Sequence, residues 1–290
     1  MFRILLWLGA RLSRRSAYGL ARGIASLLWF NEVGKVTRTN IAACFPELNP
    51  AEQEARARLS LRHMVMVFFE FGQIRYWSLE RLLENVTVEG EALITSQLAS
   101  GRGIILLVPH LGAWEILCVY LGHHHTVAAL YDPPRQPGLE AEIKAARERF
   151  AGKMFPIGVS GMRSVIRELR QGGLVAILPD QVPDQDSGVY APFFGRPALT
   201  MDLPFQLGQK TGAHLTLGVV ERICDDDVQY RIKFSQLEDE PITDIDAAVA
   251  KMNRAIEDAI QVVPEQYQWE YKRFKRPPEG GRSNIYKQRD

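Results

Sequence analysis

Cysteine is scarce in this chain. The 290 residues include only three cysteines, Cys44, Cys118 and Cys224, which lie far apart and form no Cys-x-x-Cys pair. This spacing argues against a disulfide framework and a structural zinc site, and it is typical of a protein in a reducing compartment. The histidine run at 123–125 does not restore a metal site, because adjacent side chains in a helix or strand point in different directions. We therefore expect no metal.

Net charge is also nearly absent. The chain has 35 Lys and Arg against 34 Asp and Glu, a formal net charge of +1. It therefore has no overall attraction for nucleic acid. The basic and aromatic segment 269–276 contains no RNP-like motif, so we expect no nucleic-acid partner. We interpret this segment either as an interfacial surface or as a tail packed on the domain.

The chain also lacks a long apolar run. No uninterrupted stretch of about 18 apolar residues is present, as a membrane-spanning helix would need. The first 30 residues contain no acidic residue, and arginines are scattered among their apolar and aromatic residues, which is unlike a signal peptide. The pattern favours amphipathic helices lying in the interface of an anionic membrane. The alternative is a helical hairpin packed on the protein's own core. We assign residues 1–48 to this segment.

The remaining residues, 49–290, alternate between expected strands and expected helices. Asn49-Pro50 predicts a helix start, GIILLV at 103–108 predicts a buried strand, and 245–262 predicts a long helix. Segments 213–223 and 229–235 predict an antiparallel pair. We expect one α/β domain with a mostly parallel central sheet flanked by helices, preceded by the amphipathic helical membrane appendage.

The stretch VPHLGAWE, from Val108 to Glu115, follows the buried strand directly. His110 would lie in the connecting turn and Glu115 in the first turns of the next helix. The imidazole could then fold back so that Glu115 accepts a hydrogen bond from one ring nitrogen, which leaves the other free to take a proton. The nearby helix N-terminus would offer backbone amides to a developing oxyanion. A purely structural His–Glu pair is the alternative.

No enzyme nucleophile accompanies this pair in the sequence. There is no Gly-x-Ser-x-Gly elbow, and Cys118 lies within the apolar run of the expected helix. A base without a nucleophile indicates that the substrate supplies the attacking hydroxyl.

The His-x-x-x-x-Glu spacing resembles the acyltransferase box of the glycerolipid and lysophospholipid acyltransferase superfamily. Further blocks are similar to those of the lipid A late (lauroyl/myristoyl) acyltransferases, and they follow in that family's order over nearly the whole chain. These blocks are NIAACFPEL, SGMRSVIRELRQGGLVAILPDQ, GVYAPFFGRPALT and PEQYQWEYKRFKRPPEG.

The resemblance implies a membrane-associated O-acyltransferase with His110 as the general base and Glu115 as its partner. A hydroxyl of a lipid A precursor would attack an acyl thioester carried by acyl carrier protein or, less often, by coenzyme A. No cofactor is implied, because the thioester is already activated. The expected location is the inner membrane, with the active site on its cytoplasmic face.

The same resemblance implies further binding residues. Arg147 and Arg149 resemble an Arg-x-Arg position of the family, Arg163 follows a Ser-Gly-Met turn, and Asp180 corresponds to an acidic position of the superfamily's third block. Arginines suit phosphate groups because they are always charged and can bind in a bidentate manner. The alternatives are a solvated helix face for the arginines and an ordinary turn residue for Asp180.

One loop departs from the family pattern. Tyr131-Asp132-Pro133-Pro134 has an acid where the family often has the arginine of Tyr-Arg-Pro. The same chemistry on another amphiphilic acceptor, such as a phosphatidylinositol mannoside, an ornithine lipid or a lysophospholipid, therefore stays open. A non-catalytic membrane scaffold is a third interpretation.

Overall fold

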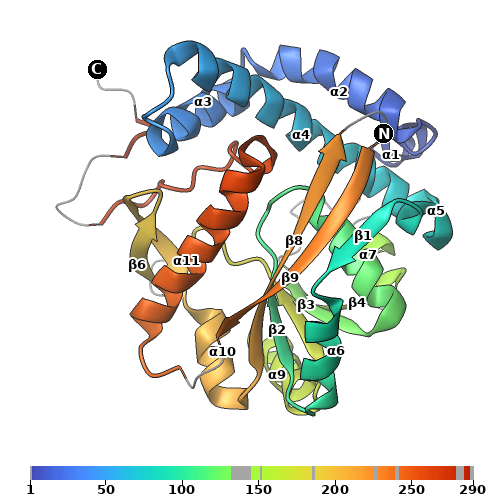
Figure 1. Cartoon of the computed structure of the whole chain (residues 1–290), viewed down its shortest axis with the longest axis vertical. Helices are drawn as coiled ribbons and strands as arrows, with labels where there is room; N and C mark the ends of the chain where they lie inside the picture. The colour runs from blue at the N-terminus through green and yellow to red at the C-terminus, as the bar shows by residue number, and fades with distance from the viewer. Residues whose placement is uncertain are drawn as a thin grey trace.

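The computed structural model describes residues 2–131, 145–150, 152–184, 187–224, 228–238, 242–278 and 284–287. Helices cover both faces of a central sheet, and the N-terminal helices, in blue in Figure 1, form a layer along one end of it. The expected α/β class with a mostly parallel sheet is confirmed.

The N-terminal layer consists of helices packed along one long helix. Its members in the described residues are α1 (Phe2–Gly9), α2 (Arg14–Leu28), α3 (Glu32–Cys44) and α4 (Pro50–Tyr76), followed by the short α5 (Leu79–Leu83). The predicted start at Asn49 is confirmed: its side chain accepts hydrogen bonds from the backbone of Ala51 and Glu52, and the Glu52 carboxylate accepts one from the Asn49 N–H. This reciprocal capping box satisfies N–H groups that have no partner within the helix.

One face of α2 is packed on the protein's own core, as the helical-hairpin interpretation predicts. A row of small side chains lets α2 approach α4 closely. The row on α2 is Ala17, Ala21 and Ala25, and the first two pack with the apolar residues Val65, Met66 and Phe69 of α4.

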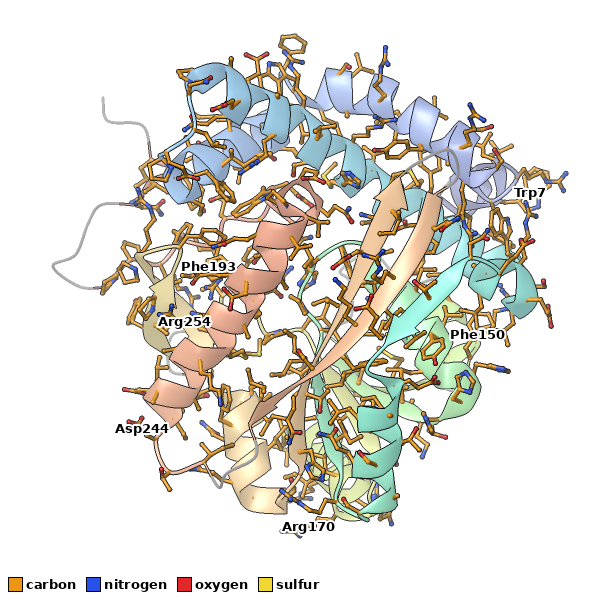
Figure 2. The ribbon with its side chains drawn as sticks, viewed as in Figure 1. Trp7, Phe150, Arg170, Phe193, Asp244 and Arg254 are labelled. Atoms are coloured by element: carbon orange, nitrogen blue, oxygen red, sulfur yellow. The ribbon has the colours of Figure 1, made fainter. Side chains whose placement is uncertain are left out.

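The outward side of α1 and α2 exposes large apolar side chains. Leu27 is 76% exposed and Phe30, just after α2, is 86% exposed; Trp7, Leu8 and Leu20 are also exposed. Trp7 projects from the edge of the molecule in Figure 2. Within the described ranges, no helix combines the length and the apolar character needed to cross a membrane.

The central sheet has the strand order β1-β9-β8-β2-β5-β3-β4. Every neighbouring pair is parallel except β8 with β9, which is antiparallel. The strands are β1 (Val86–Glu89), β2 (Ile104–Leu107), β3 (Val127–Tyr131), β4 (Gly152–Pro156), β5 (Leu174–Ile177), β8 (His214–Cys224) and β9 (Val228–Glu238).

Both faces of the sheet are covered, which explains why the central strands are apolar at every position. On β2, Ile105 and Leu107 face one apolar core, and Ile104 and Leu106 face the other. The first core is shared with α9 (Val159–Arg170), α10 (Leu203–Thr211) and α11 (Ile245–Val262). The second is shared with α6 (Glu91–Ala99) and α7 (Trp114–His124).

The predicted antiparallel pair is confirmed as β8 and β9, and the predicted long helix is confirmed as α11. The connecting residues 225–227 lie outside the described residues, as does most of the helix expected from 138 to 150, of which residues 145–148 are helical.

A hairpin formed by β6 (Gly188–Phe193) and β7 (Arg196–Met201) was not predicted from the sequence. The prolines within both strands obscure the strand pattern, since proline is confined to edges of sheets. The tight turn requires positive φ at Phe194 and Gly195. Figure 2 labels Phe193, which is fully buried between this hairpin and α11.

Candidate active site

The pairing of β2 with β5 brings His110 and Asp180 together. Leu107 at the end of β2 is paired with Ile177 at the end of β5, and the two polar residues follow their strands by equal distances. The Asp180 carboxylate accepts hydrogen bonds from His110 Nδ1 at 2.8 Å and from the His110 backbone N–H at 2.9 Å. One carboxylate therefore fixes both the backbone and the ring of the predicted base.

The surroundings of His110 define which ring nitrogen carries the proton. Burial alone would raise the pKa of the Asp180 carboxyl, but the charge and hydrogen bonds of His110, with Arg273 nearby, hold that pKa below its ordinary value. An ionised carboxylate only accepts hydrogen bonds, so Nδ1 is the donor. The lone pair then lies on Nε2, which faces the Gln181 amide nitrogen at 3.3 Å. This tautomer is the one a general base needs.

The turn that carries His110 is held by backbone contacts with distant segments. The Gln268 N–H donates to the His110 carbonyl at 3.1 Å, and the Gly112 N–H donates to the Gln266 carbonyl at 2.9 Å. Gly112 has φ +62°, and a Cβ there would lie 1.6 Å from the Val220 carbonyl oxygen. Only glycine is compatible with this close approach in the left-handed region.

A buried ion pair supports the same turn from beneath α4. Arg222 Nε and Nη2 each lie 2.6 Å from an oxygen of the Glu70 carboxylate, and Nη2 also donates to the Gly112 carbonyl at 2.8 Å. The Tyr230 hydroxyl donates to the same carboxylate. Both charged side chains are almost completely buried. Nearby, burial and the Arg222 charge lower the pKa of His63 well below its ordinary value, so this histidine is neutral.

Replacing Glu70 with Ala is expected to lower the free energy of unfolding by about 3–5 kcal/mol, because it leaves the Arg222 guanidinium buried without its counter-charge. The matched control is Glu54→Ala, which removes an exposed pair with Arg58 and should cost less than about 1 kcal/mol. Urea unfolding of both variants measures the difference. Equal stability of the two variants would show that the buried pair contributes no more than a surface pair.

Glu115 binds Arg147 rather than the imidazole. Arg147 Nε and Nη2 lie 3.1 and 2.5 Å from the two oxygens of Glu115, a bidentate arrangement. The Glu115 charge raises the pKa of Arg147 further above its ordinary value, so the guanidinium stays charged.

This second pair lies in the wall of an apolar pocket between α7 and the sheet. Small side chains on the strands, including Ala129 on β3 and Ala176 on β5, leave the space open. Cys118 also lines the pocket, and burial raises the pKa of its thiol to about 12, which keeps it protonated and unreactive. The remaining lining includes Val108, Trp114, Val127, Leu130, Gly152, Met154 and Leu178.

The other two predicted arginines lie elsewhere. Arg149 donates to the Ile74 carbonyl at the end of α4 and stacks over the ring of Phe150. Arg163 lines a surface groove along α9 with Arg167 and Arg170, and Figure 2 labels Arg170 at the end of the molecule opposite the N-terminal helices. Asp132, the departure from the family pattern, lies outside the described residues.

The structure thus groups the predicted residues as two pairs, His110 with Asp180 and Glu115 with Arg147. Sequence reasoning assigned Glu115 to His110, and the catalytic roles of both stay predictions. It missed Gln181 and Gln268, whose side chains bond to each other beside Nε2. The sequence pointed to these two glutamines only in that they lie within the blocks SGMRSVIRELRQGGLVAILPDQ and PEQYQWEYKRFKRPPEG that resemble the family. No group of three or more potential metal ligands occurs in the part of the chain described here.

Comparison with known proteins identifies the family to which the chain is similar. The family model for bacterial lipid A biosynthesis acyltransferases matches residues 1–276. The lipid A biosynthesis lauroyltransferase of Escherichia coli (strain K12) is 27% identical over 278 residues, covering 95% of this chain and 90% of the relative. The palmitoleoyltransferase of the same organism is 29% identical, covering 87% and 81%, and the myristoyltransferase is 24% identical, covering 87% and 77%.

A match over nearly the whole chain includes the His110–Asp180 and Glu115–Arg147 pairs, the pocket and the helices around them. The chain therefore belongs to the bacterial lipid A biosynthesis acyltransferase family and is an acyltransferase.

Proposed function

We propose that this protein is a membrane-associated O-acyltransferase that moves a fatty acyl chain from an acyl carrier protein thioester to a hydroxyl of a lipid A precursor. The observation that carries the proposal is the oriented His110–Asp180 pair beside an apolar pocket. The family supports acyl transfer in lipid A biosynthesis.

The proposed reaction uses His110 Nε2 as the base. It takes the proton of the acceptor hydroxyl while the hydroxyl oxygen attacks the thioester carbonyl, and the C–S bond then breaks. The departing thiolate recovers the proton from the imidazolium. Asp180 stabilises the imidazolium through Nδ1. The first N–H groups of α7, which begins at Trp114 and has no side-chain cap, support the developing oxyanion.

The pocket beneath α7 is the proposed site for the acyl chain. Its lining is almost entirely apolar, which suits a hydrocarbon chain. Among the described residues that line it, the charged ones are Glu115 and Arg147, which neutralise each other. Their bidentate contact fixes the wall of the pocket close to the base.

The outward side of α1 and α2 is the proposed membrane surface. Replacing Leu27 and Phe30 with Ser should weaken binding to vesicles containing phosphatidylglycerol about tenfold or more for each side chain, because each contributes apolar burial in the interface. Vesicle co-sedimentation measures this. The control is Val262→Ser at the end of α11, which removes a comparably exposed apolar side chain. Equal binding by the double variant and the control would place the membrane surface elsewhere.

The acceptor and the donor are tested together. Purified protein is given acyl–acyl carrier protein or acyl coenzyme A, with a lipid A precursor or a lysophospholipid as acceptor. We expect transfer from the carrier protein to the lipid A precursor.

In cells, mass spectrometry of lipid A with and without the gene should show the loss of one acyl chain. An unchanged acyl count would reject this acceptor, and acceptor-independent consumption of the thioester would reject the transfer itself.

A further inference from the structure

Glu270 follows Gln268, whose N–H donates to the His110 carbonyl, on a backbone that is held by several hydrogen bonds. The carbonyls of its two neighbours, Trp269 and Tyr271, both accept hydrogen bonds from the buried Asn40 side chain of α3, at 2.7 and 2.8 Å. The Tyr271 hydroxyl accepts a hydrogen bond from the backbone of Val182, two residues after Asp180. The backbone of Glu270 is therefore held in one place relative to the strand end that carries Asp180.

A chain of side-chain hydrogen bonds connects Glu270 to the reactive nitrogen of His110. The Gln268 side chain bonds to the Glu270 carboxyl, and its Oε1 accepts from Gln181 Nε2 at 3.0 Å. Gln181 Nε2 in turn faces His110 Nε2 at 3.3 Å. The Gln181 amide occupies the position that an acceptor hydroxyl must reach, so whatever orients this amide affects access to the base.

The Glu270 carboxyl is also incompletely bonded. Its Oε2 is buried and has no hydrogen-bond partner among the described residues. A buried carboxylate oxygen without a hydrogen-bond partner lowers the stability of the fold, so its presence indicates a role other than stabilising the fold. Burial raises the pKa of the Glu270 carboxyl to about 7, although its own backbone N–H, His110 and Gln268 each lower it. Both protonation states are therefore populated near neutral pH.

We infer that Glu270 is a positioning residue of the acyl-transfer site, whose carboxylate stabilises the imidazolium formed at His110 and orients Gln268 and Gln181 beside Nε2. The inference rests on the proposed function. Asp180 bonds to Nδ1 of the ring, and the His110 charge also acts on the Glu270 carboxyl. Other titratable groups of this region are Arg273, bonded to Leu199 and Thr200, the phenols of Tyr267, Tyr271 and Tyr286, and Lys275, which donates to the Tyr271 hydroxyl.

The pH dependence follows from the sign of the Glu270 shift. The carboxyl is neutral below about pH 7 and charged above it, so the stabilising charge appears as the pH rises. Asp180 contributes no such change near neutrality, because its pKa lies below the ordinary value. His110 must be neutral to act as the base, so part of the rise of kcat with pH belongs to His110 itself; we expect the Glu270 charge to add a further rise with a midpoint near pH 7.

The test compares Glu270→Gln with the wild type from pH 5.5 to 8.5, using the full chain, acyl–acyl carrier protein and a lipid A precursor. Glutamine keeps the shape and can still bond to Gln268, but it carries no charge. At pH 8 we expect kcat to fall about tenfold, as for one pKa unit of lost imidazolium stabilisation, with KM unchanged. The part of the rise near pH 7 that belongs to Glu270 should disappear, and the part that belongs to His110 should remain. Glu270→Asp should restore the lost part, and Glu265→Gln in the neighbouring turn η1 (Pro264–Gln266) should behave as wild type.

The outcomes separate this inference from the proposed function. If His110→Ala abolishes transfer but Glu270→Gln keeps the wild-type rate and pH profile, the inference about Glu270 is wrong and the proposed function stands. If His110→Ala retains transfer, both are wrong. A Glu270→Gln variant that loses rate equally at every pH, with a lowered melting temperature, would reduce Glu270 to a structural residue.

Discussion

Replacing His110 with Ala is expected to lower kcat for acyl transfer roughly 100- to 10,000-fold, the usual contribution of one general base. The acceptor hydroxyl would have to lose its proton to water in a largely apolar site. Binding of the acyl chain depends on the pocket beneath α7, so KM for the thioester should change little. Steady-state rates with purified protein in lipid vesicles measure both constants.

The matched control is His123→Ala, which removes an exposed histidine at the end of α7 and leaves the site untouched. The His110→Ala variant should fold normally, because its backbone N–H can still donate to Asp180 and its carbonyl can still accept from Gln268. A variant that folds, binds the thioester and turns over at a rate near that of the wild type would remove His110 as the base.

The fold could be predicted from the sequence to the extent that it depends on local patterns. The Asn49 cap, the apolar β2 strand and the α11 helix each follow from a few neighbouring residues, and each lies where it was predicted. The β6–β7 hairpin was not predicted because its prolines interrupt the alternating strand pattern. Its buried residues, such as Ala191 and Ala198, otherwise follow that pattern. Tertiary pairing, which a local pattern does not contain, stabilises such strands.

The partner of His110 could not be predicted for a related reason. Within the sequence, Glu115 is the nearest carboxylate, and Asp180 is 70 positions away. The strand order decides between them: β5 is the neighbour of β2, and their in-register pairing aligns the two strand ends. A sequence shows that two strands end in polar residues but does not state that those strands are adjacent. Asp180 was recognised only as an acid of the family pattern.

The same reasoning explains the place of Glu115. It lies in the first turn of α7 and points into the pocket, where residues 145–148 bring Arg147 within bidentate reach. Arg147, which was predicted to bind an anion of the substrate, therefore already forms an ion pair with the Glu115 carboxylate. If Arg147 contacts a substrate phosphate, the phosphate must share the guanidinium with Glu115 or displace it. Replacing Glu115 then acts first on binding, through Arg147.

Replacing Asp180 with Asn is expected to lower kcat roughly 100- to 10,000-fold, comparable to the loss of His110 itself. The asparagine amide can donate to Nδ1, which would put the ring proton on Nε2 and block the base, and it removes the charge that stabilises the imidazolium. Glu115→Gln is the matched comparison, because it neutralises the other predicted carboxylate and leaves the contact between His110 and Asp180 intact. Its main effect should be on KM. Parallel measurement of kcat and KM for both variants decides which carboxylate serves the base: a Glu115→Gln variant with the larger loss of kcat would mean that Glu115 moves to the imidazole when substrate binds.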